Sequence, residues 1–110
     1  METISEIVEK DLSDNIIKLK KPYLFDLNRN ILYNGSKLVK LTKKELLFVT
    51  LLVKNLDKII SKEDIKKNIW NDKNTDDTLL RTLVRRIRAK TDKDLVVNFQ
   101  ALGYKISKSL

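Results

Sequence analysis

Cysteine and histidine are absent from this 110-residue sequence, and glycine occurs only at positions 35 and 103. These absences exclude disulfides, thiolate chemistry and zinc sites built on Cys or His, and they remove the usual acid/base group of neutral pH. They also exclude a glycine-rich phosphate-binding loop. The remaining carboxylates form no recognisable catalytic constellation, so we predict a non-enzymatic protein that needs no cofactor and no metal.

Long apolar runs are also missing. The longest strongly apolar stretch, residues 46–53, is far too short to span a bilayer, and the acidic first residues lack the apolar segment of a signal peptide. Apolar residues still make up 42% of the chain, enough for one domain with one core. We therefore expect a cytoplasmic protein without a membrane partner.

Positive charge is plentiful and unevenly placed. The chain carries 23 basic and 15 acidic side chains, a net charge of +8, yet residues 1–15 hold five acids and only one lysine. The remainder is therefore strongly basic, which favours a polyanionic partner, with nucleic acid ahead of an anionic membrane. Charge alone leaves open a lysine-rich surface that only keeps the protein in solution.

The acidic residues 1–15 look separate from the rest of the chain. Ile4, Ile7, Val8 and Leu12 fall on one helical stripe, so this segment can form a short amphipathic helix. We interpret it as a linker or N-terminal tail, with a frayed terminus as the alternative. The folded domain is then predicted to cover residues 16–110.

Residues 16–41 have the short apolar runs of an antiparallel sheet with three or four strands. The runs lie at residues 16–19, 23–25, 31–33 and 38–39. Between the last two, Asn34 and Gly35 favour a hairpin with a tight type I′ turn, in which both central residues need positive φ.

The first predicted helix has a clear start. Thr42 and Glu45 have the spacing of a capping box, and Leu41 and Leu46 have that of a hydrophobic staple. Residues 46–53 are apolar nearly all round, which predicts that this helix is the buried central one.

Two more helices are expected. Ser61 repeats the capping pattern with Asp64 and starts a helix that ends near Trp70, and a polar loop then leads to a third helix over about residues 76–90. One arc of about 100° on the third helix is apolar and must face the core: Leu80, Leu83, Val84 and Ile87. The opposite side is polar or small: Thr78, Arg81, Thr82, Arg85, Arg86, Arg88 and Ala89.

The arginines on that polar face are the residues that indicate a function. The chain uses lysine 18 times and arginine five times, yet four of the five arginines lie between positions 81 and 88. Guanidinium is favoured where a planar fork must grip phosphate or the edge of guanine. The alternative is an exposed helix whose arginines pair with its own acids. Asp76 or Asp77 can form such a pair with Arg81, but these two acids cannot pair with all four arginines.

The C-terminal residues predict a hairpin at about residues 95–107, with strands at 95–99 and 104–106. Phe99 and Tyr104 are expected to pack within it. Trp70 has two interpretations, since it can close the core or place its indole N–H near a phosphate.

These motifs together resemble the OmpR/PhoB-type effector domain of response regulators. Residues 41–70 resemble its first two helices without a gap, residues 85–88 (Arg-Arg-Ile-Arg) the end of its recognition helix, and residues 102–106 (Leu-Gly-Tyr-Lys-Ile) the end of its wing. The resemblance covers about residues 16–108. It implies an α+β winged helix-turn-helix fold with an N-terminal antiparallel four-stranded sheet, three helices and a C-terminal β-hairpin wing.

The resemblance also implies a function, namely sequence-specific binding of duplex DNA as the output domain of a two-component response regulator. The third helix would enter the major groove and the wing would approach the minor groove. Arg81, Thr82 and Arg86 would face bases. The other expected DNA contacts are Thr78, Arg85, Arg88, Trp70, Asn98 and Gln100. The loop expected to touch RNA polymerase comprises Asn71, Asp72, Lys73, Asn74 and Thr75.

The chain departs from the family pattern at three places. Arg81 stands where Asp is common, Leu83 where His is common, and Gln100-Ala101 where the wing often has Arg-Gly, which predicts weaker readout by the wing. The sequence has no room for a receiver domain, so it is either an excised C-terminal domain, which we favour, or a stand-alone regulator. Tandem binding of two copies to direct repeats is implied. A winged helix that docks a protein instead of DNA is the alternative function.

Overall fold

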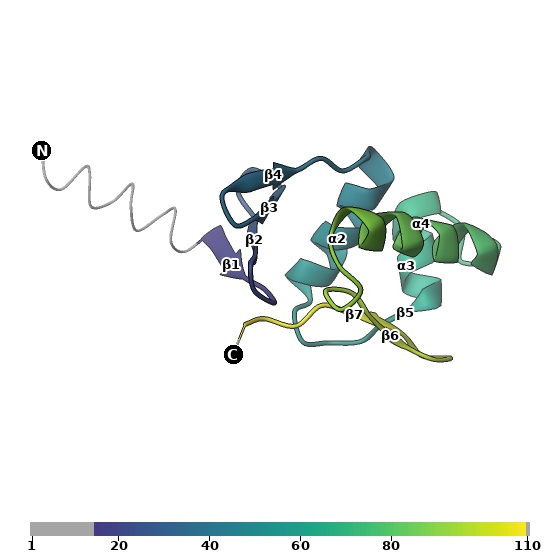
Figure 1. The fold of residues 1–110 in the computed structure, drawn as a ribbon. Coiled ribbons are helices and arrows are strands. Elements are labelled where there is room, and N and C mark those ends of the chain that lie inside the picture. The colour runs from purple at the N-terminus through teal and green to yellow at the C-terminus, as the bar shows by residue number, and fades with distance from the viewer. Residues whose placement is uncertain (1–14, 110) are drawn as a thin grey trace, which may run out of the picture.

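The computed structural model describes residues 15–109, and the interpretation of residues 1–14 as a linker or amphipathic helix lies outside this range. Its elements form two sheets and three helices, arranged as the predicted α+β winged helix-turn-helix (Figure 1). No helix within residues 15–109 is long and apolar enough to cross a membrane. The division of the chain at residue 15 stays a prediction.

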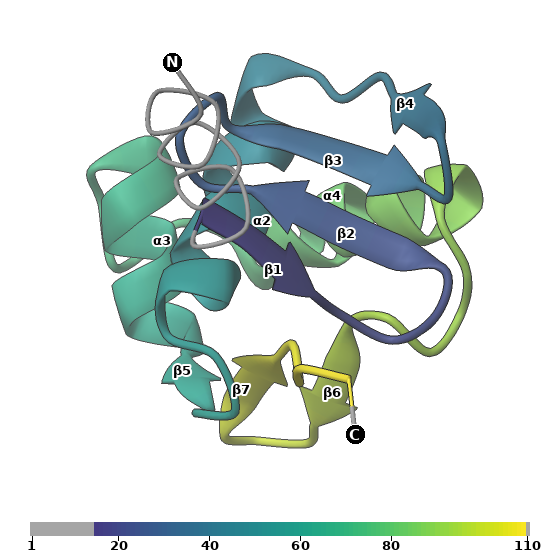
Figure 2. The same cartoon turned by 90° about the vertical axis from the view of Figure 1, so that its left-hand side faces the viewer.

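The N-terminal sheet has four antiparallel strands in sequence order. They are β1 (Ile16–Lys18), β2 (Tyr23–Asp26), β3 (Ile31–Asn34) and β4 (Lys37–Val39). One row of cross-strand partners, formed by Ile17, Phe25, Leu32 and Val39, belongs to the hydrophobic core or packs against it. The helices lie behind this sheet in Figure 2. The predicted fourth strand is therefore confirmed.

The β3–β4 turn differs from the prediction. Asn34 pairs with Lys37, so the two central residues are Gly35 and Ser36, and of these only Gly35 has positive φ, at 63°. Positive φ at the first central residue alone is the pattern of a type II′ turn, which also requires glycine there. The hairpin is confirmed, but its turn lies one residue later than the type I′ interpretation placed it.

The first two helices begin where their caps predict. Thr42 caps α2 (Lys43–Lys54) with both halves of the capping box formed, and Ser61 caps α3 (Lys62–Trp70). Phe48, Val49 and Leu52 of α2 are fully buried. The expectation of burial nearly all round was wrong for Leu47, which is 43% exposed and lines a surface hollow together with Asn68 of α3.

The third helix, α4 (Asp77–Lys90), follows its predicted range and is capped by Asp76. All four residues of the predicted apolar arc are buried. Because that arc faces the core, the arginine-bearing side of α4 must face outward.

The wing is part of a three-stranded sheet. Strands β6 (Val97–Phe99) and β7 (Gly103–Lys105) form the predicted hairpin, and β5 (Ile60–Ser61) pairs with the far side of β7. The residues of β5 had been expected only as the start of α3. Gly103 permits this pairing, because a Cβ there would lie 1.9 Å from the Ile60 carbonyl oxygen.

Candidate nucleic-acid interface

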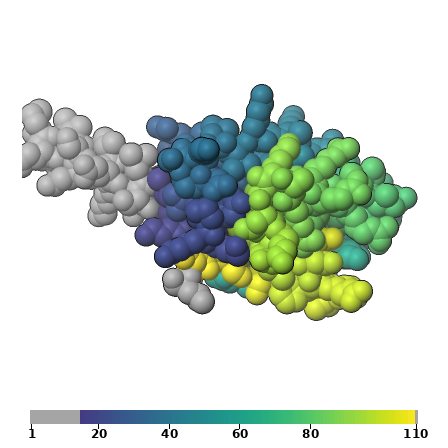
Figure 3. Space-filling view, viewed as in Figure 1, coloured from purple at the N-terminus to yellow at the C-terminus, as the bar shows by residue number. Residues whose placement is uncertain are grey.

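The outward face of α4 presents most of the predicted DNA-contacting side chains. Thr78, Arg81, Arg85 and Arg86 are exposed, whereas Thr82 is half-buried. Figure 3 shows α4 on the same side of the molecule as the wing. One continuous surface therefore carries both elements.

The acids at the start of α4 already have other partners. Asp76 accepts a hydrogen bond from the backbone N–H of Thr78 at 2.8 Å, which lowers the pKa of Asp76. Asp77 accepts one from the buried ammonium of Lys66, which holds the pKa of Asp77 below its ordinary value. Sequence reasoning had not singled out Lys66, which fixes the start of α4 to α3.

The arginines of α4 form no ion pairs with these acids. Within residues 15–109, none of the four forms an ion pair, and Arg81 makes only a 3.5 Å contact with the Thr78 hydroxyl. Arg81 lies near enough to Asp76 and Asp77 to help lower the pKa of both acids, but no ion pair between an α4 arginine and an acid forms within the described residues. The charge of these arginines remains available to an external anion.

The last turn of α4 is tied to α2. The Lys90 ammonium lies 2.6 Å from Oε1 of Glu45, which is buried and also accepts a 2.9 Å hydrogen bond from the Thr42 N–H. Burial opposes ionisation of Glu45, but these hydrogen bonds outweigh it and lower its pKa. One carboxylate thus completes the α2 capping box and holds the last turn of α4.

Arg88 is placed differently from the other three arginines. Its Nη2 donates to the Val96 carbonyl at 2.8 Å, and its half-buried side chain leaves Nε without a hydrogen-bond partner within residues 15–109. Val96 is buried immediately before β6. The side chain expected near a phosphate therefore also joins α4 to the wing.

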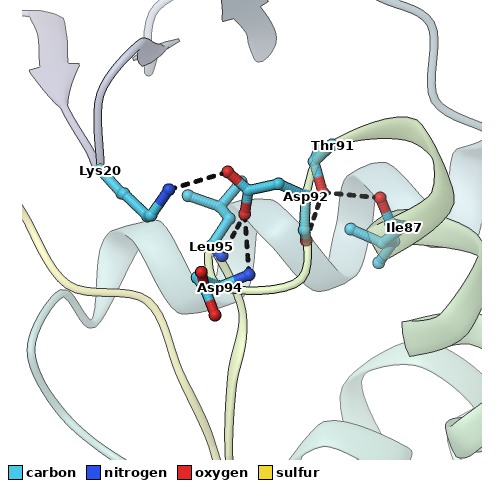
Figure 4. Close-up of polar contacts among 6 residues, drawn as sticks. All are labelled: Lys20, Ile87, Thr91, Asp92, Asp94 and Leu95. Atoms are coloured by element: carbon cyan, nitrogen blue, oxygen red, sulfur yellow. Dashed lines mark hydrogen bonds and ion pairs between the residues drawn. The ribbon is translucent and has the colours of Figure 1, made fainter.

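A compact turn follows α4 (Figure 4). Asp92 accepts hydrogen bonds from the N–H groups of Asp94 and Leu95, both at 2.8 Å, and forms a 3.0 Å ion pair with Lys20 of the β1–β2 turn. Burial opposes ionisation of Asp92, but these contacts outweigh it and lower its pKa. The N-terminal sheet is thereby linked to the junction between α4 and the wing.

The loop between α3 and α4 is exposed and locally ordered. Asn71 ends α3 in the left-handed conformation, with φ 58°. Asp72 accepts from the Asn74 N–H at 2.9 Å, and its carbonyl accepts from the Thr75 hydroxyl at 2.6 Å. Lys73, between them, is exposed. This loop offers polar groups to solvent on a fixed backbone.

The aromatic residues mostly pack. Tyr104 is buried with its ring edge-on to Phe48, at 5.8 Å between centroids, and Phe99 lies beneath the Lys105 ammonium. Trp70 is half-buried against the core and also lines a surface groove. Asn98 and Gln100 of the wing are exposed.

The Glu45 contacts predict a pH dependence. Because the folded-state pKa lies below the ordinary value of 4.5, ionised Glu45 stabilises the fold above that pH, and this contribution is lost as the pH falls through the folded pKa. We expect Glu45→Gln, which can still cap α2, to lower the free energy of unfolding by about 1 kcal/mol at pH 7, since Lys90 is partly exposed. In urea unfolding, the difference between the two proteins should shrink as the pH falls below 4.5. A difference that does not shrink with falling pH would contradict the assignment.

Comparison with known proteins places this arrangement in a family. Residues 35–106 match the family described as "Transcriptional regulatory protein, C terminal". The chain is similar to the sensory transduction protein BceR of Bacillus subtilis, with 34% identity over 61% of this chain and 29% of BceR. It is also similar to the regulatory protein VanRB of Enterococcus faecalis, with 31% identity over 73% of this chain and 36% of VanRB.

The fold has solved counterparts. The DNA-binding domain of Klebsiella pneumoniae RstA, in complex with the RstA box, superposes with a TM-score of 0.71 at 15% identity, covering 84% of this chain and 96% of that one. The chain spans about a third of the length of BceR and VanRB. On the match over residues 35–106, the chain belongs to the C-terminal domains of transcriptional regulatory proteins, the OmpR/PhoB type of winged helix domain found in response regulators.

Proposed function

We propose that this protein binds duplex DNA in a sequence-specific way as the output domain of a transcriptional regulator. The observation that carries the proposal is the set of exposed arginines on α4, which form no ion pair within residues 15–109. A helix bearing guanidinium groups can enter the major groove and contact both phosphates and base edges. The RstA domain, which shares the fold, was solved bound to its DNA box, and this supports the proposal.

In this arrangement Arg81, Thr82 and Arg86 face bases, while Thr78 and Arg85 lie nearer phosphates. Arg88 and Trp70, which are both partly buried, contact the phosphate backbone of the DNA. The wing, with Asn98 and Gln100, approaches the adjacent minor groove. Since the wing lacks an arginine at its tip, most discrimination between sequences comes from α4.

Three further assignments belong to the proposal. The exposed loop of residues 71–75 is the surface for RNA polymerase, and two copies bind direct repeats in tandem. Residues 1–15 are a linker to a receiver domain, consistent with a chain that spans only part of its relatives. The protein acts where its DNA partner is, in the cytoplasm.

The test is a titration against a labelled random-sequence duplex by fluorescence anisotropy at about 50 and 200 mM salt. Affinity should fall by about 10³-fold or more across that range if six or more side chains grip phosphates. A steep fall supports DNA binding and justifies selecting an operator from a random pool. If no binding occurs even at about 50 mM salt, the DNA proposal fails and a protein-docking winged helix becomes the leading interpretation.

A further inference from the structure

A groove lies between the start of α2 and one flank of α4, beside the face already described. We call it the α2–α4 groove. Its lining comes from three helices and their caps: Thr42, Lys43, Lys44, Glu45, Trp70, Leu79, Thr82, Leu83 and Arg86. Two of these residues, Thr82 and Arg86, also belong to the proposed DNA-contacting face, so the groove is continuous with it.

The groove has unbalanced positive charge. Its one acid, Glu45, is buried and already paired with Lys90. Lys43, Lys44 and Arg86 are exposed, and none of them forms a side-chain hydrogen bond or ion pair within the part of the chain from 15 to 109. Three cations around a groove without a free carboxylate are complementary to an anion.

The position of the groove relative to α4 identifies the anion. At about 100° per residue, Arg81, Arg85 and Arg88 lie within about 60° of one another on the flank nearest the wing. Leu79, Thr82 and Arg86 lie within about 60° on the other flank, which borders the groove. A helix in a major groove about 12 Å wide has one phosphate backbone on each side. On the wing side, Arg85 and Arg88 lie near one phosphate backbone, and the other backbone runs along the side of α4 that faces α2.

We propose that the α2–α4 groove is a second phosphate-binding site, in which Lys43 and Lys44 grip the DNA backbone on the α2 side of the recognition helix. This inference rests on the proposed function and extends its footprint to α2. Lysine suits this role because contact with phosphate needs a point charge with reach, whereas reading a base edge needs the fork of an arginine. Thr82 and Trp70 offer a hydroxyl and an indole N–H at the same groove.

The test compares two double variants that lose equal charge. Lys43→Ala/Lys44→Ala removes the groove lysines, and Lys54→Ala/Lys58→Ala removes two exposed lysines at and beyond the opposite end of α2. Binding to one duplex is measured over a range of salt concentrations. In the groove variant, the slope of log affinity against log salt should be less steep by about 2, because each lost phosphate contact contributes about 0.9. The Lys54/Lys58 variant should keep the wild-type slope.

The outcomes separate this inference from the proposed function. If the wild type shows a steep slope and both variants keep it, the groove holds no phosphate and only the second site is refuted. Equal losses of slope in the two variants also refute it, since the effect is then one of net charge. If the wild type itself does not bind, both proposals fail. All four lysines are exposed, so the melting temperatures should not change, and unchanged melting temperatures would exclude loss of fold as the cause of weaker binding.

Discussion

Replacing Arg85 and Arg86 together with alanine is expected to lower affinity for a selected operator by about 100-fold, since each guanidinium contact contributes about 1–2 kcal/mol. The two side chains are adjacent in sequence but leave α4 on opposite flanks, so the double variant removes one contact to each side of the major groove. Neither side chain is buried or paired within the described residues, so the melting temperature should not change.

Two matched variants sharpen this result. Arg85→Lys/Arg86→Lys keeps the charge but loses the planar fork, and it should retain binding to random DNA while losing preference for the operator. Arg29→Ala/Lys37→Ala removes two charges from the N-terminal sheet and should leave preference for the operator intact. If the Arg85→Ala/Arg86→Ala protein bound the operator with wild-type affinity, α4 would not be part of the DNA interface.

Local signals account for what the sequence predicted well. The capping box of Thr42 and Glu45, the cap at Ser61 and the apolar arc of α4 each depend on residues within one or two helical turns of one another. The start of each helix and the outward face of α4 could therefore be predicted from the sequence. Short apolar runs with turn residues between them predicted a sheet of three or four strands, and the family resemblance implied the four that the structure shows.

Features that depend on contacts between different elements could not be predicted from the sequence. Strand β5 exists because β7 can approach it closely at Gly103, where Gly103 pairs with Ser61 and Tyr104 pairs with Ile60. Nothing in the sequence of residues 60–61 predicts that partner. The type of the β3–β4 turn depended on strand register, which a shift of one residue changes. The α2–α4 groove needs the start of α2 beside α4, and the ion pairs of Lys66 and Lys90 that hold α4 span 11 and 45 residues.

Arg88 is a single residue whose role could be predicted only in part from the sequence. Its place on the helix predicted a phosphate contact, and the structure shows that part of its guanidinium is committed to the Val96 carbonyl. A buried carbonyl that loses its hydrogen-bond donor costs about 1–3 kcal/mol, and Val96 is buried. Since Val96 leads directly into β6, the cost falls on the segment that positions the wing.

We therefore expect Arg88→Ala to weaken operator binding by about tenfold and to loosen the wing, whereas Arg85→Ala weakens binding with the wing unchanged. Amide hydrogen exchange distinguishes the two, because it reports local opening of hydrogen-bonded strands. In Arg88→Ala, exchange should accelerate across β6 and β7 and stay at the wild-type rate in α2. If exchange in β6 and β7 is unchanged while the salt slope falls by about 1, Arg88 acts only as a phosphate contact and its link to the wing is not needed.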